Sequence, residues 1–312
     1  MTSRPTEYIF NLNRTLGSGS IRSISLEEGI SVLELNLNVK EDIKLTIDTL
    51  LGTHANFIYC SKGKLSHSFG NNDRVNTIET FQTSILSNIV SPTNTILVEK
   101  NVQTVATIIS VNTKSADSET SHWNSALRQT FIGQKMEDYL YIGSYNLKIA
   151  EYIKQLQAIK QEGLVRALLT KGIVNMILAL EIEQHNNDLN NSDLAATSLT
   201  KTDVLAIEEL TEFIENYPDL DHKIDNLTKK TGLSAAKIQE GFKFKHGLTV
   251  CEYIRYVRLT KSEELISNTD LNISEIVYSL GFSSRSYFSK IFRERFNCSP
   301  THYKKNKLAV SA

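Results

Sequence analysis

The sequence has few residues of the kinds that impose special chemistry on a fold. Its three cysteines, Cys60, Cys251 and Cys298, are odd in number and far apart, and none belongs to a CxxC or Cys/His cluster. This excludes a disulfide framework and a structural zinc site. No apolar run approaches the roughly 20 residues of a membrane span, and the opening MTSRPTEYIF lacks the basic-then-apolar layout of a signal peptide. We therefore expect a reduced, soluble, cytoplasmic protein without contact to a membrane.

Signatures of catalysis are also missing. The chain has no GxxxxGK[ST] phosphate loop and no Ser-His-Asp or Cys-His arrangement at a recognisable spacing. His54 and His67 form no HxH pair, and His122 lies outside the runs that resemble strands, so three or four metal ligands are not gathered in the sequence. We expect no enzymatic activity, no cofactor and no metal.

Charge is present in both signs but is unevenly distributed along the chain. Residues 223–312 hold 16 Lys and Arg against 8 Asp and Glu, a balance of +8. Residues 1–222 hold the other 18 against 27, a balance of −9. Only the C-terminal part is therefore expected to meet a polyanion.

Hydrophobic periodicity divides the chain into a strand-rich part and a helical part. Through residues 1–120, short apolar runs alternate with polar residues, as at Leu33, Leu35, Leu37 and Val39, and turn-like Asn, Gly, Asp and Ser separate them. This predicts a β-sandwich or barrel. Residues 121–185 read as helices, and the run from 163 to 184 is apolar on almost every side in its second half, so it must be buried against the strand domain or a second subunit. Residues 186–202, rich in Asn, form a linker.

From residue 203 onward the sequence predicts only helices. Asp203 can cap the first of them, which Pro218 ends. Two later stretches, 224–247 and 273–297, share one layout: a short helix, a Gly-apolar-Ser turn, and a second helix with an aromatic-basic pair. In Gly232-Leu233-Ser234 and Gly281-Phe282-Ser283, the glycine suits a left-handed position and the serine an N-cap.

Such a pair of helices is the layout of a helix-turn-helix, whose second helix enters the major groove of DNA. A plain helical hairpin with a solvated basic face would explain one copy. Two copies in the basic part of the chain favour DNA binding. Leu259, Leu265, Ile276, Leu280, Phe288 and Phe292 read as the core of this part.

Residues 224–305 resemble the DNA-binding domain of the AraC/XylS family of bacterial transcription regulators. The resemblance rests on "GLS...I...FK...G.T..EYI...RL" and above all on "NISEIVYSLGFSSRSYFSKIFRERFNCSP..Y". The runs "KIQEGFKFKHGLTVCEYIR" and "GLVRALLTKGIVNMILALEI" further resemble the branch with siderophore-responsive regulators. The domain assigned by this resemblance is 203–312.

The resemblance implies double-stranded promoter DNA and RNA polymerase as partners, activation as the mode of regulation, and a set of DNA-binding residues. Base edges would meet the first turns of each second helix, and phosphates would meet the later cations. The residues carried over by position are Ala236, Lys237, Gln239, Glu240, Lys243, Arg285, Ser286, Ser289, Lys290, Arg293, Arg295, Lys304 and Lys305. A long helix from Thr249 to Ser267 would hold the two units about 34 Å apart along the DNA.

The strand-rich domain, through "GTHANFIYCSKGKLSHSF", resembles the cupin-like sensing barrel of such regulators. The expected architecture is therefore an α+β multidomain chain with a cupin-like β-barrel, a helical connector and an all-α domain. The barrel would bind a small-molecule effector through Phe57, Tyr59, His67 and Phe81, and the connector would form a homodimer. A cupin metalloenzyme fused to a DNA-binding module, and an architectural DNA binder indifferent to sequence, are the alternatives.

Overall fold

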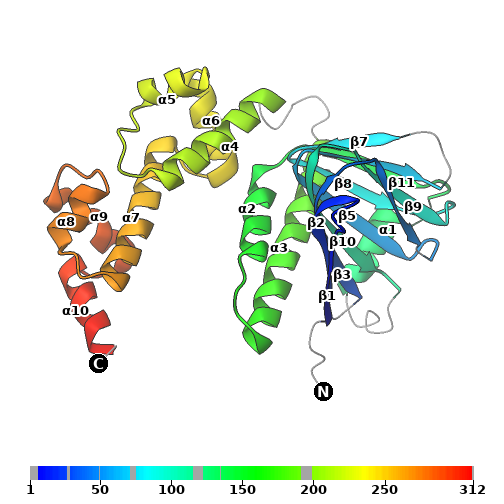
Figure 1. Cartoon of the computed structure of the whole chain (residues 1–312), viewed down its shortest axis with the longest axis horizontal. Helices are drawn as coiled ribbons and strands as arrows, with labels where there is room; N and C mark the ends of the chain where they lie inside the picture. The colour runs from blue at the N-terminus through cyan, green and yellow to red at the C-terminus, as the bar shows by residue number, and fades with distance from the viewer. Residues whose placement is uncertain are drawn as a thin grey trace. The chain divides into compact units, whose positions relative to one another are not determined.

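The computed structural model describes residues 6–26, 29–48, 50–70, 75–114, 122–133, 135–190 and 199–310. The chain divides into two compact units, residues 1–196 (unit 1) and 197–312 (unit 2). Unit 1 contains the strands and three helices, and unit 2 contains helices throughout its described residues (Figure 1). This confirms the division of the fold into a sheet-rich part and a helical part.

Unit 1 is built on two antiparallel sheets. One has the strand order β1-β2-β3-β10-β5-β8-β11 and the other β4-β9-β6-β7. The strands are β1 (Thr6–Asn11), β2 (Gly17–Ser25), β3 (Ile30–Val39), β4 (Ile43–Asp48), β5 (His54–Lys62), β6 (Lys64–Phe69), β7 (Asn76–Glu79), β8 (Gln82–Ser87), β9 (Thr93–Val98), β10 (Gln103–Asn112) and β11 (Tyr139–Tyr145).

The core of unit 1 lies between the two sheets. On β3 the alternation read from the sequence directs Leu35, Leu37 and Val39 inward, where they pack with residues of the second sheet such as Leu65 and Ile96. Because side chains alternate along a strand, the opposite face of the larger sheet is left for other elements to cover. Helices cover part of it.

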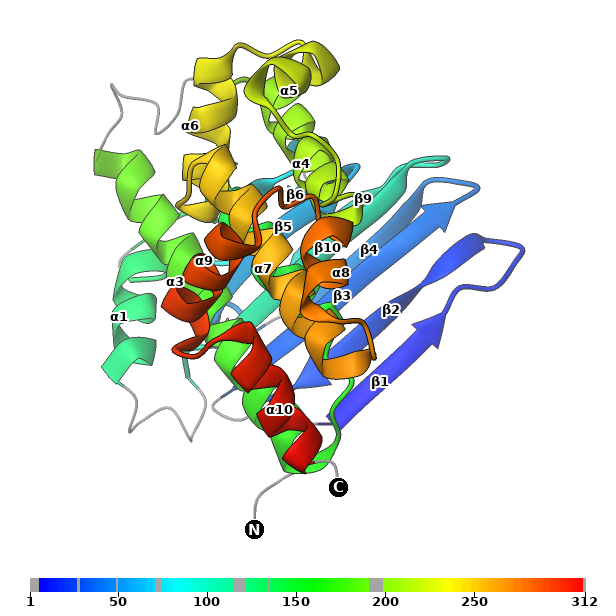
Figure 2. The ribbon, with the colours of Figure 1, turned by 90° about the vertical axis from the view of Figure 1, so that its left-hand side faces the viewer.

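These helices are α1 (His122–Phe131), α2 (Leu147–Gln157) and α3 (Gly163–Asn190). In Figure 2, β1, β2 and β3 follow in order on the right-hand side of unit 1, and α1 and α3 lie on the left. Between α1 and α2 the chain adds β11, which pairs with β8 at the other edge of the larger sheet. The expectation of a separate helical connector over 121–185 therefore differs from the structure, because this segment completes the sheet and covers it.

One face of α3 docks on β11 through polar side chains. Asp188 accepts hydrogen bonds from the Tyr141 hydroxyl (2.5 Å) and the Ser144 amide (3.0 Å). His185 Nε2 lies 2.7 Å from the Tyr139 hydroxyl. One turn earlier, Glu181 is buried, which raises its pKa well above the usual value. The contacts of Asp188 and His185 tie this face of α3 to β11 and its neighbouring residues, because these side chains would lose their partners elsewhere.

The other face of α3 carries exposed apolar side chains. They form a stripe that we call the α3 stripe: Leu164, Val165, Leu168, Leu169 and Met176. The expectation that the second half of the run is buried holds within the single chain for Val174, Ile177 and Leu178, whereas four of the five residues of the stripe lie in the first half. The expectation that no apolar run is long enough to span a membrane is wrong: by length and composition alone, Gly163–Leu189 is a candidate span, with a mean hydropathy of 1.6 in its most apolar window.

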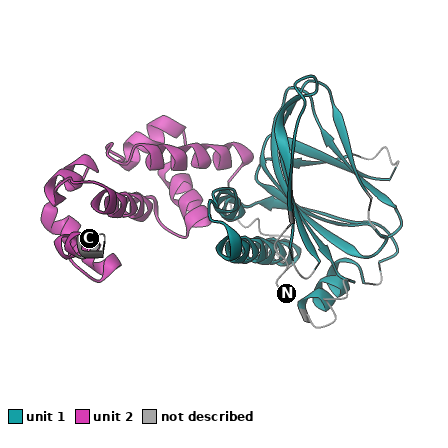
Figure 3. Ribbon diagram, turned by 60° about the horizontal axis from the view of Figure 1, so that its bottom comes forward, with its two compact units in different colours: residues 1–196 teal, residues 197–312 magenta. Residues whose placement is uncertain are grey.

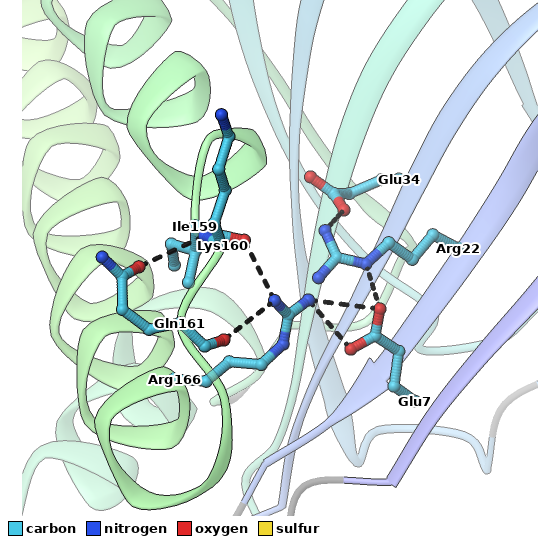
Figure 4. A network of polar contacts seen from close by, with 7 residues as sticks. All are labelled: Glu7, Arg22, Glu34, Ile159, Lys160, Gln161 and Arg166. Carbon is cyan, nitrogen blue, oxygen red and sulfur yellow. Dashed lines mark hydrogen bonds and ion pairs between the residues drawn. The ribbon is translucent and has the colours of Figure 1, made fainter.

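The start of α3 is tied to the edge of the larger sheet by a charge network (Figure 4). Arg166 donates to both carboxylate oxygens of Glu7 on β1, at 3.0 and 3.3 Å. Glu7 also accepts from Arg22 on β2, and Arg22 donates to the buried Glu34 on β3, both at 2.7 Å. Arg166 further donates to the carbonyl of Ile159 before the helix. Side chains of alternating charge thus join helix α3 to the strands β1, β2 and β3.

Helix α3 extends to Asn190, so the linker predicted at 186–202 begins inside a helix. Of the rest of the expected linker, residues 191–198 lie outside the described residues, and residues 201–202 are the first two of helix α4 (Lys201–Asn216). The boundary between the two units falls between residues 196 and 197 of the chain, within that predicted segment (Figure 3).

The helices of unit 2 are α4 (Lys201–Asn216), α5 (Ile224–Thr231), α6 (Ala235–His246), α7 (Val250–Asn268), α8 (Ile273–Ser279), α9 (Arg285–Phe296) and α10 (Pro300–Val310). Thr200, and not Asp203, is the N-cap of α4; Asp203 is the third helical residue and completes a capping box. The core predicted for this part is confirmed, with Ile276, Phe288 and Phe292 fully buried and Leu265 partly buried against them.

Candidate nucleic-acid interface

The first helix-turn-helix has the cap chemistry predicted from its sequence. Helix α5 ends at Gly232, which has a left-handed φ of 71°. The Ser234 side chain then accepts a hydrogen bond from the Lys237 amide and begins α6. Gly247, also left-handed, ends α6. The turn between the helices is therefore determined by two residues, one for its φ and one for its side-chain oxygen.

The second helix-turn-helix is one residue longer in its turn. Helix α8 ends near Leu280 and Gly281, whose φ is 73°. The N-cap of α9 is Ser284, whose side chain accepts from the Tyr287 amide, so the prediction of Ser283 is wrong by one position. The added residue gives Phe282 room to enter the core, where it packs against Phe288. Asn297 ends α9 in the left-handed conformation, as predicted.

Aligning the two N-caps matches α6 and α9 position by position. Ile238 and Phe242 on α6 correspond to Phe288 and Phe292 on α9, and all four are buried. With 3.6 residues per turn, the opposite faces carry 236, 240 and 243 on α6 and 286, 290 and 293 on α9. These are positions predicted to meet DNA.

On α9 this outer face is cationic. Arg285, Ser286, Lys290 and Arg293 are exposed, and Ser289 is partly buried at the flank. Within the described residues, none of the three cations makes an ion pair or a side-chain hydrogen bond. They are available to an anionic partner in the geometry that the helix already has.

On α6 the predicted residues are more constrained. Lys237 Nζ lies 2.6 Å from Asp203 Oδ2 on α4, and the Gln239 side chain accepts a hydrogen bond from the Val250 amide at the start of α7. Ala236 and Lys243 are exposed, whereas Glu240 is partly buried. The position of Lys290 on α9 is therefore occupied by an acid, Glu240, on α6. The two second helices present different charges.

Comparison with known proteins places this arrangement in a family. A helix-turn-helix domain model matches residues 227–306. The chain is 36% identical over 84 residues to the probable transcription factor PqrA of Proteus vulgaris and covers 69% of that protein and 27% of itself. It is 32% identical over 130 residues, 41% of its own length, to the transposon Tn10 TetD protein of Escherichia coli, covering 94% of it. The chain belongs to the AraC/XylS family of transcription regulators.

A longer relative matches over less of its length. The Msm operon regulatory protein of Streptococcus mutans is 30% identical over 145 residues, and the chain spans 49% of it. The match covers 45% of this chain. As a member of the AraC/XylS family, the chain is a DNA-binding transcription regulator.

Two of the cations predicted to bind phosphate are engaged within unit 2 of the regulator. The Arg295 guanidinium stacks over the Tyr256 ring at 4.3 Å and donates to Thr260. Lys304 Nζ donates to the carbonyl of Leu271. Arg293 and Lys305 are exposed. Arg295 is exposed as well, so its contacts within unit 2, and not burial, distinguish it from Arg293. The lack of such contacts among the described residues favours Arg293 and Lys305 over Arg295 and Lys304 as phosphate ligands.

Arg258, which sequence reasoning did not single out, connects the two helix-turn-helix units. From α7 it donates to the carbonyls of Pro218 (2.7 Å) and Leu220 (3.0 Å) between α4 and α5, and to that of Gly281 (3.0 Å) in the second turn. A Cβ on Gly281 would lie 2.5 Å from the Asp219 carbonyl oxygen. The loop between α4 and α5, which precedes the first helix-turn-helix, thus touches the turn of the second one.

The four predicted effector-binding residues do not lie together in unit 1: three lie on the helix-covered side of the larger sheet, and the fourth is on β6 of the smaller sheet. Phe57 packs against Phe131 of α1, with ring centroids 5.6 Å apart. The Tyr59 hydroxyl donates to the Asn146 carbonyl, and the Phe81 carbonyl accepts from the Asn146 amide. These three therefore lie on the helix-covered side.

His67, by contrast, faces the interior between the sheets. It shares its strand face with Leu65, a member of that core, and its side chain is fully buried. Nε2 lies 2.9 Å from Asn94 Oδ1, and burial lowers its pKa. Nδ1 has no hydrogen-bond partner within the described residues. Across those same residues, no group of three or more His, Cys, Asp and Glu side chains lies close enough to hold a metal ion.

Proposed function

We propose that this regulator is a ligand-responsive activator whose protomers each read two successive major grooves of promoter DNA. The observation that carries the proposal is the exposed cationic face of α9. Its counterpart α6 lies at the other end of α7, whose 19 residues give a helix about 28 Å long. Successive major grooves on one DNA face are about 34 Å apart, a comparable distance.

In this proposal the two recognition helices divide the reading of bases. Arg285 and Lys290 suit guanine N7 and O6, and Ser286 and Ser289 suit either strand at short range. On α6, Gln239 suits adenine once it leaves the Val250 amide, and Glu240 suits the amino group of cytosine. Lys243, Arg293 and Lys305 suit phosphates, which add affinity without sequence information.

The α3 stripe supports a homodimer. Its apolar side chains are exposed at fractions up to 69% for Leu164. An added Cβ on Gly172, in the middle of the same helix, would meet nothing within 4 Å, so a second helix has room to approach. A charged Leu168→Glu variant is expected to shift the mass in solution at micromolar concentration from dimer to monomer. Leu50→Glu changes a leucine that is even more exposed, 74% against 62% for Leu168, and should leave the mass unchanged.

The effector is proposed to be a small molecule held in unit 1. Of the four candidates, His67 is the best supported, because a buried acceptor without a partner favours a ligand that donates a hydrogen bond. Native mass spectrometry of protein purified from cells would detect such a molecule in the wild type and none in His67→Phe. By likeness to the family we also propose RNA polymerase as a partner, activation as the outcome and the cytoplasm as the location.

The test of the DNA-binding proposal is selection of bound sequences from a random DNA pool. The wild type is expected to enrich a long motif with two blocks about one helical turn apart. An Arg285→Ala/Lys290→Ala variant should alter one block and preserve the other. The charge-matched control Lys44→Ala/Lys62→Ala changes exposed lysines of unit 1 and should leave both blocks unchanged. No enriched motif, with binding that only weakens as salt rises, would contradict base reading.

A further inference from the structure

The ion pair between α4 and α6 links a helix cap to a predicted DNA contact. Asp203 Oδ2 accepts from the Thr200 amide at 2.8 Å and from Lys237 Nζ at 2.6 Å. The Asp203 side chain is 8% exposed. Although burial opposes its ionisation, the hydrogen bonds from Lys237 and Thr200 hold the pKa of Asp203 below its usual value. Asp203 is therefore a charged group at neutral pH, fixed in place by the capping box.

Lys237 differs from the other cations of the predicted interface. Its side chain is 38% exposed, so water and an approaching phosphate can reach it. Its ammonium is nevertheless at contact distance from a buried carboxylate, whereas Arg285, Lys290 and Arg293 on α9 have no such partner within the described residues. A phosphate would have to replace Asp203 to bind Lys237, and replacement leaves the carboxylate buried and unpaired, which costs free energy.

We propose that Asp203 is a positioning residue that withholds Lys237 from the DNA phosphates. The first helix-turn-helix then binds the DNA backbone with one cation fewer than the lysines of α6 could supply, and α9 supplies most of the electrostatic affinity. This inference rests on the proposed entry of α6 into a major groove. It explains how two helix-turn-helix units of the same layout contribute unequally to one complex.

The test measures how the binding constant depends on salt, for the full chain on its selected duplex. Each phosphate neutralised by a protein cation adds about 0.9 to the slope of log K against log salt. Asp203→Asn keeps an oxygen for the Thr200 amide but removes the charge. It is expected to steepen the slope by about 0.9, so that affinity falls about 3.5-fold more than in the wild type between 50 and 200 mM salt.

Lys237→Ala provides the second arm. In the wild-type background it should leave the slope unchanged, and in the Asp203→Asn background it should return the slope to the wild-type value. Glu208→Gln is the matched control, because Glu208 pairs α4 with Lys245 of α6 in a buried position that DNA cannot reach. It disturbs the same two helices and should not steepen the slope.

Two results would overturn the inference. A loss of about 0.9 in the slope on Lys237→Ala alone would mean that Lys237 already binds a phosphate in the wild type. An unchanged slope in Asp203→Asn, with a footprint that covers both blocks, would mean that Lys237 does not reach the backbone even when released. A footprint over one block only would refute the two-groove proposal as well, so the two failures are distinguishable.

Discussion

Replacing Arg258 is expected to loosen the connection between the two helix-turn-helix units. Arg258→Met keeps the length of the side chain but removes three donors, which bond to the carbonyls of Pro218, Leu220 and Gly281. A hydrogen bond from a charged group contributes about 1.5–3 kcal/mol. Three such bonds would sum to about 4.5–9 kcal/mol. Because two of the three are exposed to solvent and contribute less, we expect a smaller total loss, about 3 kcal/mol.

Hydrogen exchange of the full chain, read on peptides covering 217–222 and 278–284, measures this loss directly. A decrease of about 3 kcal/mol in the free energy of local opening speeds exchange roughly 10²-fold. Arg255→Met is the matched control, because Arg255 is an exposed arginine three positions earlier on α7. It should leave both peptides unchanged.

The same variant should also tolerate a changed spacing between the two DNA blocks. When Arg258 holds the two helix-turn-helix motifs together, inserting one base pair between the two DNA blocks rotates one block by about 35° relative to the other and weakens binding. The Arg258→Met protein should lose part of this discrimination. Exchange rates equal to those of Arg255→Met, or an undiminished preference for the original spacing, would refute the assignment of Arg258 as the connection.

Three further substitutions test the packing and the buried ionisable groups. Gly241→Ala is expected to destabilise unit 2 by about 1–3 kcal/mol in urea unfolding, because the new Cβ would lie 2.4 Å from the side chain of Ile207; no shift of the midpoint would contradict the tight α4–α6 contact. Glu181→Gln should stabilise unit 1 near pH 8 and change little near pH 4. The wild-type carboxyl has a pKa raised by burial, so its stability falls as pH rises above the unfolded pKa, and equal effects at both pH values would be inconsistent with this. Absorbance titration of the tyrosines should lose a component near pH 12 in Tyr303→Phe, since the hydrogen bond to Glu263 raises the pKa of Tyr303 to about 12; retention of that component would assign it elsewhere.

The local chemistry of unit 2 was predictable because its signals are close in sequence. A glycine with positive φ and a serine cap two residues later determine the first turn without help from the rest of the chain. The second turn was misplaced by one residue because the burial of Phe282 determines its length, and burial depends on the tertiary core. At the start of α4, Thr200 and Asp203 are both good N-cap residues and lie three positions apart. Thr200 is the N-cap, and Asp203 completes the capping box as the third helical residue.

Contacts between distant residues were not predictable from pattern. The pair Asp203–Lys237 spans 34 residues and Arg258–Gly281 spans 23, and periodicity carries no information on which charged side chains meet. Strand β11 is only seven residues long and stands among helices, so its pairing with β8, more than 50 residues earlier, had no local signal. Of these three contacts, Asp203–Lys237 is the one that engages a predicted DNA-binding side chain, and it leaves that side chain 38% exposed.

The charge network at the start of α3 also bears on the order in which unit 1 is completed during synthesis. Glu7 and Arg166 are separated by 159 residues. At about 5–20 residues per second, roughly 8–30 s pass between the emergence of the two residues from the ribosome. During that interval the hairpin of β1 and β2 can form, and Glu7 can pair with Arg22, the other cation that contacts it among the described residues. The N-terminal edge of the sheet therefore acquires its final neighbours only when the last helix of unit 1 is made.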